Sequence, residues 1–289
     1  MRIAITGYAS LDHVTMLDGV PQPGRTTTIL DRPENAWPRL GGSPAYVAAA
    51  LVANGIAEAF PVSWIGDDAA AGAYLTQLTQ KRIPHDGIVV VQGARTPIAI
   101  LAYEPEGGCL CLYDPGMASE PTLSDVQRDL IAKVDWVCVT IGPQDATAAV
   151  LETVGPAMKL AWVVKHDPRV MPMPLAARLA ARADLICCSQ AESGFVREAL
   201  ASAKPRQGQI RIETHGRSGA GFTCGEANGF VAASAVAVSD PTGAGDSFAG
   251  GVLAALAKGE TDMASIVEAG HRAAAALLAT RFNHEVESA

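Results

Sequence analysis

Short, continuous apolar segments alternate with segments of helical periodicity along most of this chain, and this alternation restricts the fold more than any other feature. Strands of this continuous kind are typical of a parallel sheet that is covered on both faces. The alternation therefore predicts an α/β fold with a doubly wound, mostly parallel sheet and helices on both faces. The predicted strands are residues 2–7, 60–66, 135–142, 161–167, 184–189 and 209–216, and the predicted helices are residues 45–53, 69–81, 145–154, 175–183 and 191–200.

Two regions interrupt this rhythm. Residues 12–39 are rich in Pro, Gly and Thr, and residues 98–114 resemble two antiparallel strands around a Glu-Pro-Glu-Gly-Gly turn at 104–108. We expect the regions 12–39 and 95–114 to form one small β-sheet lid over the carboxyl edge of the main sheet. The alternative is two unrelated surface excursions. No second independent domain is visible, so residues 1–289 are expected to form a single domain.

Composition excludes several classes of protein. The 289 residues carry a net charge of −8, and no basic run stands out, so a nucleic-acid partner is not expected. The N-terminus is predicted to enter a strand directly, so no signal peptide is expected, and no apolar run, that at 273–279 included, is long enough to cross a bilayer. The six cysteines form no CxxC pair, which favours reduced thiols in a cytoplasmic protein.

The chemistry of the chain is most visible in the sequence Asp-Pro-Thr-Gly-Ala-Gly-Asp at 240–246. A β-prone run, 230–238, precedes it and a helical segment, 247–257, follows it. A glycine-rich turn from strand to helix points backbone N–H groups at one place, where the helix N-terminus favours an anion such as phosphate. Gly243, Ala244 and Gly245 are therefore expected to bind a transferring phosphoryl group. Asp246 is expected to take the proton of an acceptor hydroxyl, although capping of the helix would also explain it.

An acceptor site is suggested by two earlier segments. Asp12 is expected at the end of the first strand, where ligands of doubly wound sheets bind, and its carboxylate could hold two sugar hydroxyls. Gly41 and Gly42 let the backbone approach a ligand closely before a helix that has Pro44 in its first turn. A surface turn and an ordinary loop-to-helix junction are the alternative explanations.

Residues at the ends of two further predicted strands could contribute to a nucleotide-binding site. Glu192 could hold Mg²⁺ near the phosphates, and helix capping explains it equally well. The loop at 214–221 could pass beneath the nucleotide. The chain has neither a P-loop nor a G-x-G-x-x-G fingerprint, so a redox enzyme with a dinucleotide cofactor is disfavoured.

Together these segments resemble the ribokinase-like (PfkB) family of sugar and nucleoside kinases over nearly the whole chain. The resemblance implies that Asp246 is the catalytic base and that the turn before it is the anion hole. It implies ATP and Mg²⁺ as cofactors, a sugar or nucleoside as acceptor, and a homodimer formed through the lid. The residues implied for the acceptor are Asp12, Gly41, Gly42 and Tyr46, and those implied for ATP are Thr214, Gly216, Gly219 and His271.

The chain departs from the family pattern at several positions. Tyr46 and Ser189 stand where the family usually has Asn, and Arg169 directly follows Pro168 in a shortened D-x-N-x-R element. Residues 280–285 lack the Gly-Ala loop that often binds potassium, so activation by a monovalent cation is left open. Two functions remain, an ATP-dependent kinase and a sugar- or nucleotide-binding protein that has lost catalysis. The retained turn at 243–246 favours the kinase.

Overall fold

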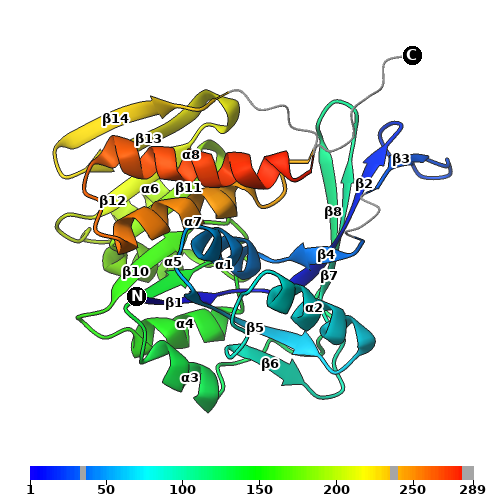
Figure 1. The fold of residues 1–289 in the computed structure, drawn as a ribbon, viewed down its shortest axis with the longest axis horizontal. Helices are drawn as coiled ribbons and strands as arrows, with labels where there is room; N and C mark the ends of the chain where they lie inside the picture. The colour runs from blue at the N-terminus through cyan, green and yellow to red at the C-terminus, as the bar shows by residue number, and fades with distance from the viewer. Residues whose placement is uncertain (33–36, 235–239, 282–289) are drawn as a thin grey trace.

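The computed structural model describes residues 1–32, 37–234 and 240–281, and its main sheet confirms the predicted fold class. Nine strands lie in the order β14-β13-β12-β11-β10-β9-β1-β5-β6 (Figure 1). Neighbouring strands from β12 to β6 are parallel, and the β12-β13-β14 edge is antiparallel. The strands are β1 (Arg2–Thr6), β5 (Glu58–Gly66), β6 (Ile88–Val91), β9 (Trp136–Val139), β10 (Lys159–Val163), β11 (Leu185–Ser189), β12 (Ile210–Thr214), β13 (Gly219–Cys224) and β14 (Ala227–Ala232).

Helices cover both faces of this sheet. In β1, Ile3 and Ile5 belong to one hydrophobic core, whereas Ala4 between them belongs to the other. Burial on both faces is the reason why the strands are continuously apolar rather than alternating. The first core is covered by α1 (Ser43–Ala53), α2 (Ala69–Gln80), α7 (Ala244–Ala257) and α8 (Met263–Ala279), and the second by α3 (Asp125–Ile131), α4 (Gln144–Thr153), α5 (Met173–Arg182) and α6 (Ser193–Ala201).

A smaller sheet stands beside the main one and contains the expected hairpin. Its order is β3-β2-β7-β8, with β4 paired to β2. The position expected for Asp12 is wrong: β1 already ends at Thr6, and Asp12 lies inside β2, paired with Arg39 of β4 and Ala99 of β7. The strands are β2 (Ser10–Leu17), β3 (Ile29–Asp31), β4 (Arg39–Gly41), β7 (Ile98–Tyr103) and β8 (Cys109–Asp114).

The antiparallel edge of the main sheet differs from the expectation of a loop at 214–221. Residues 216–218 form a single 3₁₀ turn, and Gly219–Cys224 form β13, which pairs with β14. The sequence pattern does not predict this strand, because its first three residues, Gly-Ala-Gly, have little β propensity of their own. The β-prone run expected at 230–238 begins inside β14, and its residues 235–238 lie outside the described part of the chain.

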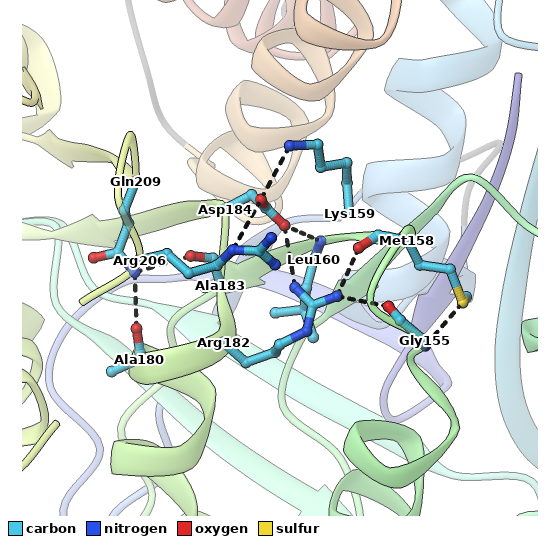
Figure 2. A network of polar contacts seen from close by, with 10 residues as sticks. All are labelled: Gly155, Met158, Lys159, Leu160, Ala180, Arg182, Ala183, Asp184, Arg206 and Gln209. Atoms are coloured by element: carbon cyan, nitrogen blue, oxygen red, sulfur yellow. Dashed lines mark hydrogen bonds and ion pairs between the residues drawn. The ribbon is translucent and has the colours of Figure 1, made fainter. Parts of the chain in front are cut away.

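A charged network joins the amino ends of β10 and β11 (Figure 2). Asp184, just before β11, accepts a hydrogen bond from the Leu160 amide at 2.9 Å and pairs with Arg182 at 3.3 Å. Lys159 and Arg206 lie 3.2 and 3.6 Å from its other oxygen. Arg182 also donates to the carbonyls of Gly155 and Met158.

This network predicts a stability effect that is separate from activity. Asp184→Ala should lower the free energy of unfolding by about 1–3 kcal/mol, because it leaves the Leu160 amide without its acceptor and Arg182 without its carboxylate. Urea unfolding measures the change. Glu152→Ala is the control: it removes an exposed 3.9 Å ion pair to Arg178, for which less than about 1 kcal/mol is expected. An equal loss in both variants would contradict a special role for Asp184.

Candidate active site

The turn at 240–246 leads directly into α7 and leaves several backbone donors free. Gly243, at φ +77°, is the last residue before the helix. The Ala244 amide donates to the carbonyl of Pro241 at 3.0 Å, so the expectation that Ala244 offers its N–H to a ligand is wrong. The amides of Gly243, Gly245 and Asp246 make no hydrogen bond within the described residues. Free N–H groups at a helix N-terminus form an anion site.

Asp240 holds the start of this turn in place. One carboxylate oxygen accepts the Thr242 amide at 3.0 Å, and the other accepts Arg39 at 2.5 Å and lies 3.3 Å from Arg281. Burial alone would raise the pKa of Asp240, but the hydrogen bond and charge of Arg39, with the charge of Arg281, hold it below its usual value. Arg39 comes from the lid and Arg281 from just beyond the end of α8, so segments distant in sequence meet at the turn.

Asp246 lies in the first turn of α7 and is 5% exposed. The helix cap is Gly243, and the Oδ1 atom of Asp246 has no hydrogen-bond partner. The alternative explanation of Asp246 as a helix cap is therefore wrong. A buried carboxylate oxygen without a partner is costly, which indicates that a ligand group completes it.

A cavity of 630 Å³ opens on one side of the turn, and its volume is in the range of ligand sites. All four residues implied for ATP line it, together with Ala244 and Gly245. His271 lies 3.2 Å from the Val231 carbonyl and edge-on to Phe248, which fixes one wall. The sequence did not identify the other lining residues, among them Arg217, Phe248, Arg272, Leu278 and the lid residues Tyr103 and Gly107.

The residues expected to bind the acceptor cluster on the other side of the turn. The Tyr46 hydroxyl donates to Oδ2 of Asp12 at 2.8 Å, and the Ser10 hydroxyl donates to Oδ1 at 2.6 Å. Asp12 is 3% exposed, and this burial raises its pKa. Gly41 packs directly against the Asp12 carboxylate, where any Cβ would collide with it.

The Tyr46 ring connects the cluster around Asp12 to the turn at 240–246. A Cβ at Gly243 would lie only 2.6 Å from Cδ1 of Tyr46, so the ring packs against the turn itself. The guanidinium of Arg281 lies over the same ring, 5.9 Å from its centroid. From the lid, the Tyr103 hydroxyl hydrogen-bonds that of Thr242 at 2.5 Å. The turn thus lies between the larger cavity and the Asp12–Tyr46 cluster.

A second cavity, of 230 Å³, lies between the lid and the carboxyl edge of the main sheet. Tyr8, Trp64 and Tyr113 supply aromatic walls. The Tyr8 hydroxyl donates to both oxygens of Glu120, at 2.8 and 3.0 Å. The sequence did not single out these residues.

Glu192 closes a capping box. Its Oε2 accepts the amide and the hydroxyl of Ser189, both at 2.9 Å, so the capping alternative is the one observed. The described residues contain no group of three or more His, Cys, Asp or Glu side chains that could hold a metal ion. Mg²⁺ commonly binds through one or two carboxylates and substrate phosphates, and the remaining oxygen of Glu192 fits that limited role.

The fold and the site define an α/β protein of the ribokinase-like type. A family model described as pfkB family carbohydrate kinase matches residues 2–282, and the chain belongs to this family. "Fructokinase-2" of Solanum habrochaites is 27% identical over 245 residues, which are 78% of this chain and 74% of that protein. "Probable fructokinase-5" of Arabidopsis thaliana is 25% identical, over 75% of this chain and 74% of its own length.

Solved structures share the fold. The nucleoside kinase of Methanocaldococcus jannaschii has a TM-score of 0.78 at 17% sequence identity, and the alignment covers 96% of this chain and 92% of that chain. The ribokinase of Cryptococcus neoformans in complex with ADP has a TM-score of 0.78 at 20% identity, covering 96% of this chain and 93% of its own. Within the described residues, no helix is long and apolar enough to cross a membrane.

Proposed function

We propose that this protein is an ATP-dependent kinase that transfers the γ-phosphoryl group to a hydroxyl of a sugar or nucleoside. The observation that carries the proposal is the position of the turn at 240–246, between a nucleotide-sized cavity and the buried Asp12–Tyr46 cluster, with Asp246 unpaired beside it. The relatives support this range of acceptors: plant fructokinases match the sequence, and a nucleoside kinase of Burkholderia thailandensis with the same fold was solved with inosine.

The chain's own residues supply a route for the transfer. ATP lies in the cavity bounded by Thr214, Gly216, Gly219 and His271. Asp246 accepts the proton of the acceptor hydroxyl as its oxygen forms a bond to the γ-phosphorus, and the bond from that phosphorus to the β,γ-bridging oxygen breaks to release ADP. The free N–H groups of Gly243 and Gly245 stabilise the charge that develops on the phosphoryl oxygens. When bound, Mg²⁺ would neutralise the phosphates, with Glu192 beside it.

A binding protein without catalysis is the second candidate, and the closed Tyr46–Asp12 contact is the observation that favours it. The buried state of Asp246 argues against it. A protein that only binds a ligand gains nothing from a partnerless buried carboxylate oxygen, which costs stability. Ligand binding without phosphoryl transfer to any acceptor would establish this second candidate.

Tyr46 is expected to control which acceptors are used. Tyr46→Phe removes one donor from the buried Asp12 carboxylate and should lower the free energy of unfolding by about 1–3 kcal/mol. It also opens Oδ2 to an acceptor, so kcat/KM should shift toward substrates with vicinal hydroxyls. Tyr74→Phe is the matched control, because the buried Tyr74 hydroxyl has no partner to lose. An unchanged acceptor profile in Tyr46→Phe would contradict this role.

We also propose a homodimer through the lid. Ile100 and Leu112 face each other across β7 and β8, with Leu110 on the same face, and all three are exposed. Apolar side chains on a small sheet favour covering by a partner. Light scattering measures the oligomeric state, and Leu112→Asp should shift it to monomer.

The kinase proposal is tested by an ADP-release assay with MgATP over a panel of sugars and nucleosides, preceded by a thermal-shift screen. A ligand at 100 times its Kd should stabilise the protein by about 2.7 kcal/mol. We expect stabilisation by ATP and ADP, and acceptor-dependent ADP release. ADP release that no acceptor accelerates would contradict the proposal.

A further inference from the structure

Lys165 lies at the carboxyl edge of the main sheet without belonging to any motif of the sequence. It follows β10, which lies between β9 and β11 in the middle of the sheet. The amide of Val164 still donates to the Cys187 carbonyl of β11 at 2.8 Å, so the backbone is fixed up to the residue before Lys165. The carboxyl ends of parallel strands are where such sheets bind their ligands.

The ammonium group of Lys165 is not used by the fold. Within the described residues it makes no hydrogen bond and no ion pair within 4.0 Å, and its side chain is only partly exposed. The charge of Asp246, followed by that of Glu192, raises the pKa of Lys165, and it outweighs the opposing effect of burial. Lys165 is therefore charged, and the charges of both carboxylates act on it although neither forms an ion pair with its ammonium within 4.0 Å.

The nearby cation that the sequence did single out is used differently. Arg169 donates to Asp167 at 2.6 and 3.0 Å, and its side chain is 86% exposed. This pair satisfies Asp167 at the surface. The guanidinium of Arg169 is thus paired with Asp167, whereas the ammonium of Lys165 has no such partner within the described residues.

The buried carboxylate of Asp246 and the ammonium of Lys165 form no ion pair with each other, so neither charge is satisfied by the other. Oδ1 of Asp246 has no partner, and separated charges of this kind are costly unless another group completes them. A phosphoryl group with its attacking hydroxyl satisfies both, because the hydroxyl donates to Asp246 and the phosphoryl oxygens accept from an ammonium. Lysine is a common ligand of phosphate as a point charge.

We propose that Lys165 is a catalytic residue of this chain, which binds the oxygens of the transferring γ-phosphoryl group opposite Asp246. The inference rests on the proposed kinase function. The ammonium holds negative charge as the bond to the incoming hydroxyl oxygen forms and the bond to ADP breaks, and Lys165 keeps all its protons. Its contribution is greatest when charge is spread over the three phosphoryl oxygens, so it acts mainly on kcat.

The test compares Lys165→Met and Lys165→Arg with wild type in steady-state kinetics on the best acceptor. Lys165→Met should lower kcat by about 10²–10³-fold and change the KM for ATP much less, as for other single groups that stabilise transition-state charge. Lys165→Arg, which retains the charge, should recover part of the loss. Lys258→Met, at the far end of α7, is the control and should match wild type.

The outcomes separate the two claims. ADP-induced thermal stabilisation of Lys165→Met shows that the variant is folded and binds nucleotide. A stabilised Lys165→Met variant that turns over as fast as wild type overturns the role of Lys165 and leaves the kinase function intact. Equal losses in the Met and Arg variants overturn the charge-based role as well. A wild-type protein that transfers phosphate to no acceptor overturns the kinase function, and the role of Lys165 with it.

Discussion

Asp246→Asn is expected to lower kcat by about 10²–10⁴-fold, the contribution of a positioned general base. The asparagine has nearly the same shape but cannot take the proton of the acceptor hydroxyl. The KM for ATP should change little, because Asp246 is not among the residues that line the nucleotide cavity. Initial rates of ADP release at saturating ATP and acceptor measure the effect.

Stability separates this loss from a folding defect. The free energy of unfolding of Asp246→Asn should be no lower than that of wild type, because a neutral amide is less costly to bury than a partnerless carboxylate oxygen. Asp145→Asn is the matched control, since Asp145 is an exposed carboxylate in the first turn of α4. Full activity of Asp246→Asn would show that the base is another group.

Gly243→Ala is expected to damage both activity and stability. The residue has φ +77°, where an L side chain costs about 1–2 kcal/mol, and its Cβ would lie 2.6 Å from the Tyr46 ring. Relief of that collision must move either the ring or the turn, and moving the turn displaces the N–H donors. Loss of one such donor costs about 10²–10³-fold in kcat, which initial rates would reveal.

Gly208→Ala is the control for Gly243→Ala, because it measures only the energetic cost of a positive φ for an L residue. Gly208 has φ +73°, but a Cβ there would meet nothing within 4 Å. Both variants should lose stability in urea, and Gly243→Ala should lose more. If Gly243→Ala kept its activity and was no less stable than Gly208→Ala, the close packing of Tyr46 on the turn would not matter to the site.

The main sheet is predictable from the sequence because its strands are buried on both faces, which gives apolar runs that local patterns identify. The edge hairpin is not. In β13 the segment Gly219–Cys224 is rich in small residues, and its strand state depends on pairing with β14 rather than on its own propensity. The sequence pattern predicts the wrong strand for Asp12 because the chain leaves the main sheet after Thr6 and enters the lid within a few residues.

The candidate site is predictable where a motif is local. The 240–246 turn and the residues implied for ATP lie together around one cavity, as the family resemblance implies. The contacts that shape the turn are not local: Arg39 and Asp240 are 201 residues apart. The same holds for Tyr103 with Thr242, since only the folded sheet and lid bring this pair together.

The most direct test of the kinase mechanism is the identification of its product. Wild type and Asp246→Asn are incubated with MgATP and the panel of sugars and nucleosides, and ADP and phosphorylated acceptor are measured together by mass spectrometry. We predict that wild type forms one phosphorylated acceptor for each ADP and that Asp246→Asn forms both at least about 100 times more slowly. Release of ADP without a phosphorylated acceptor, or equal rates in the two proteins, would contradict phosphoryl transfer with Asp246 as the base.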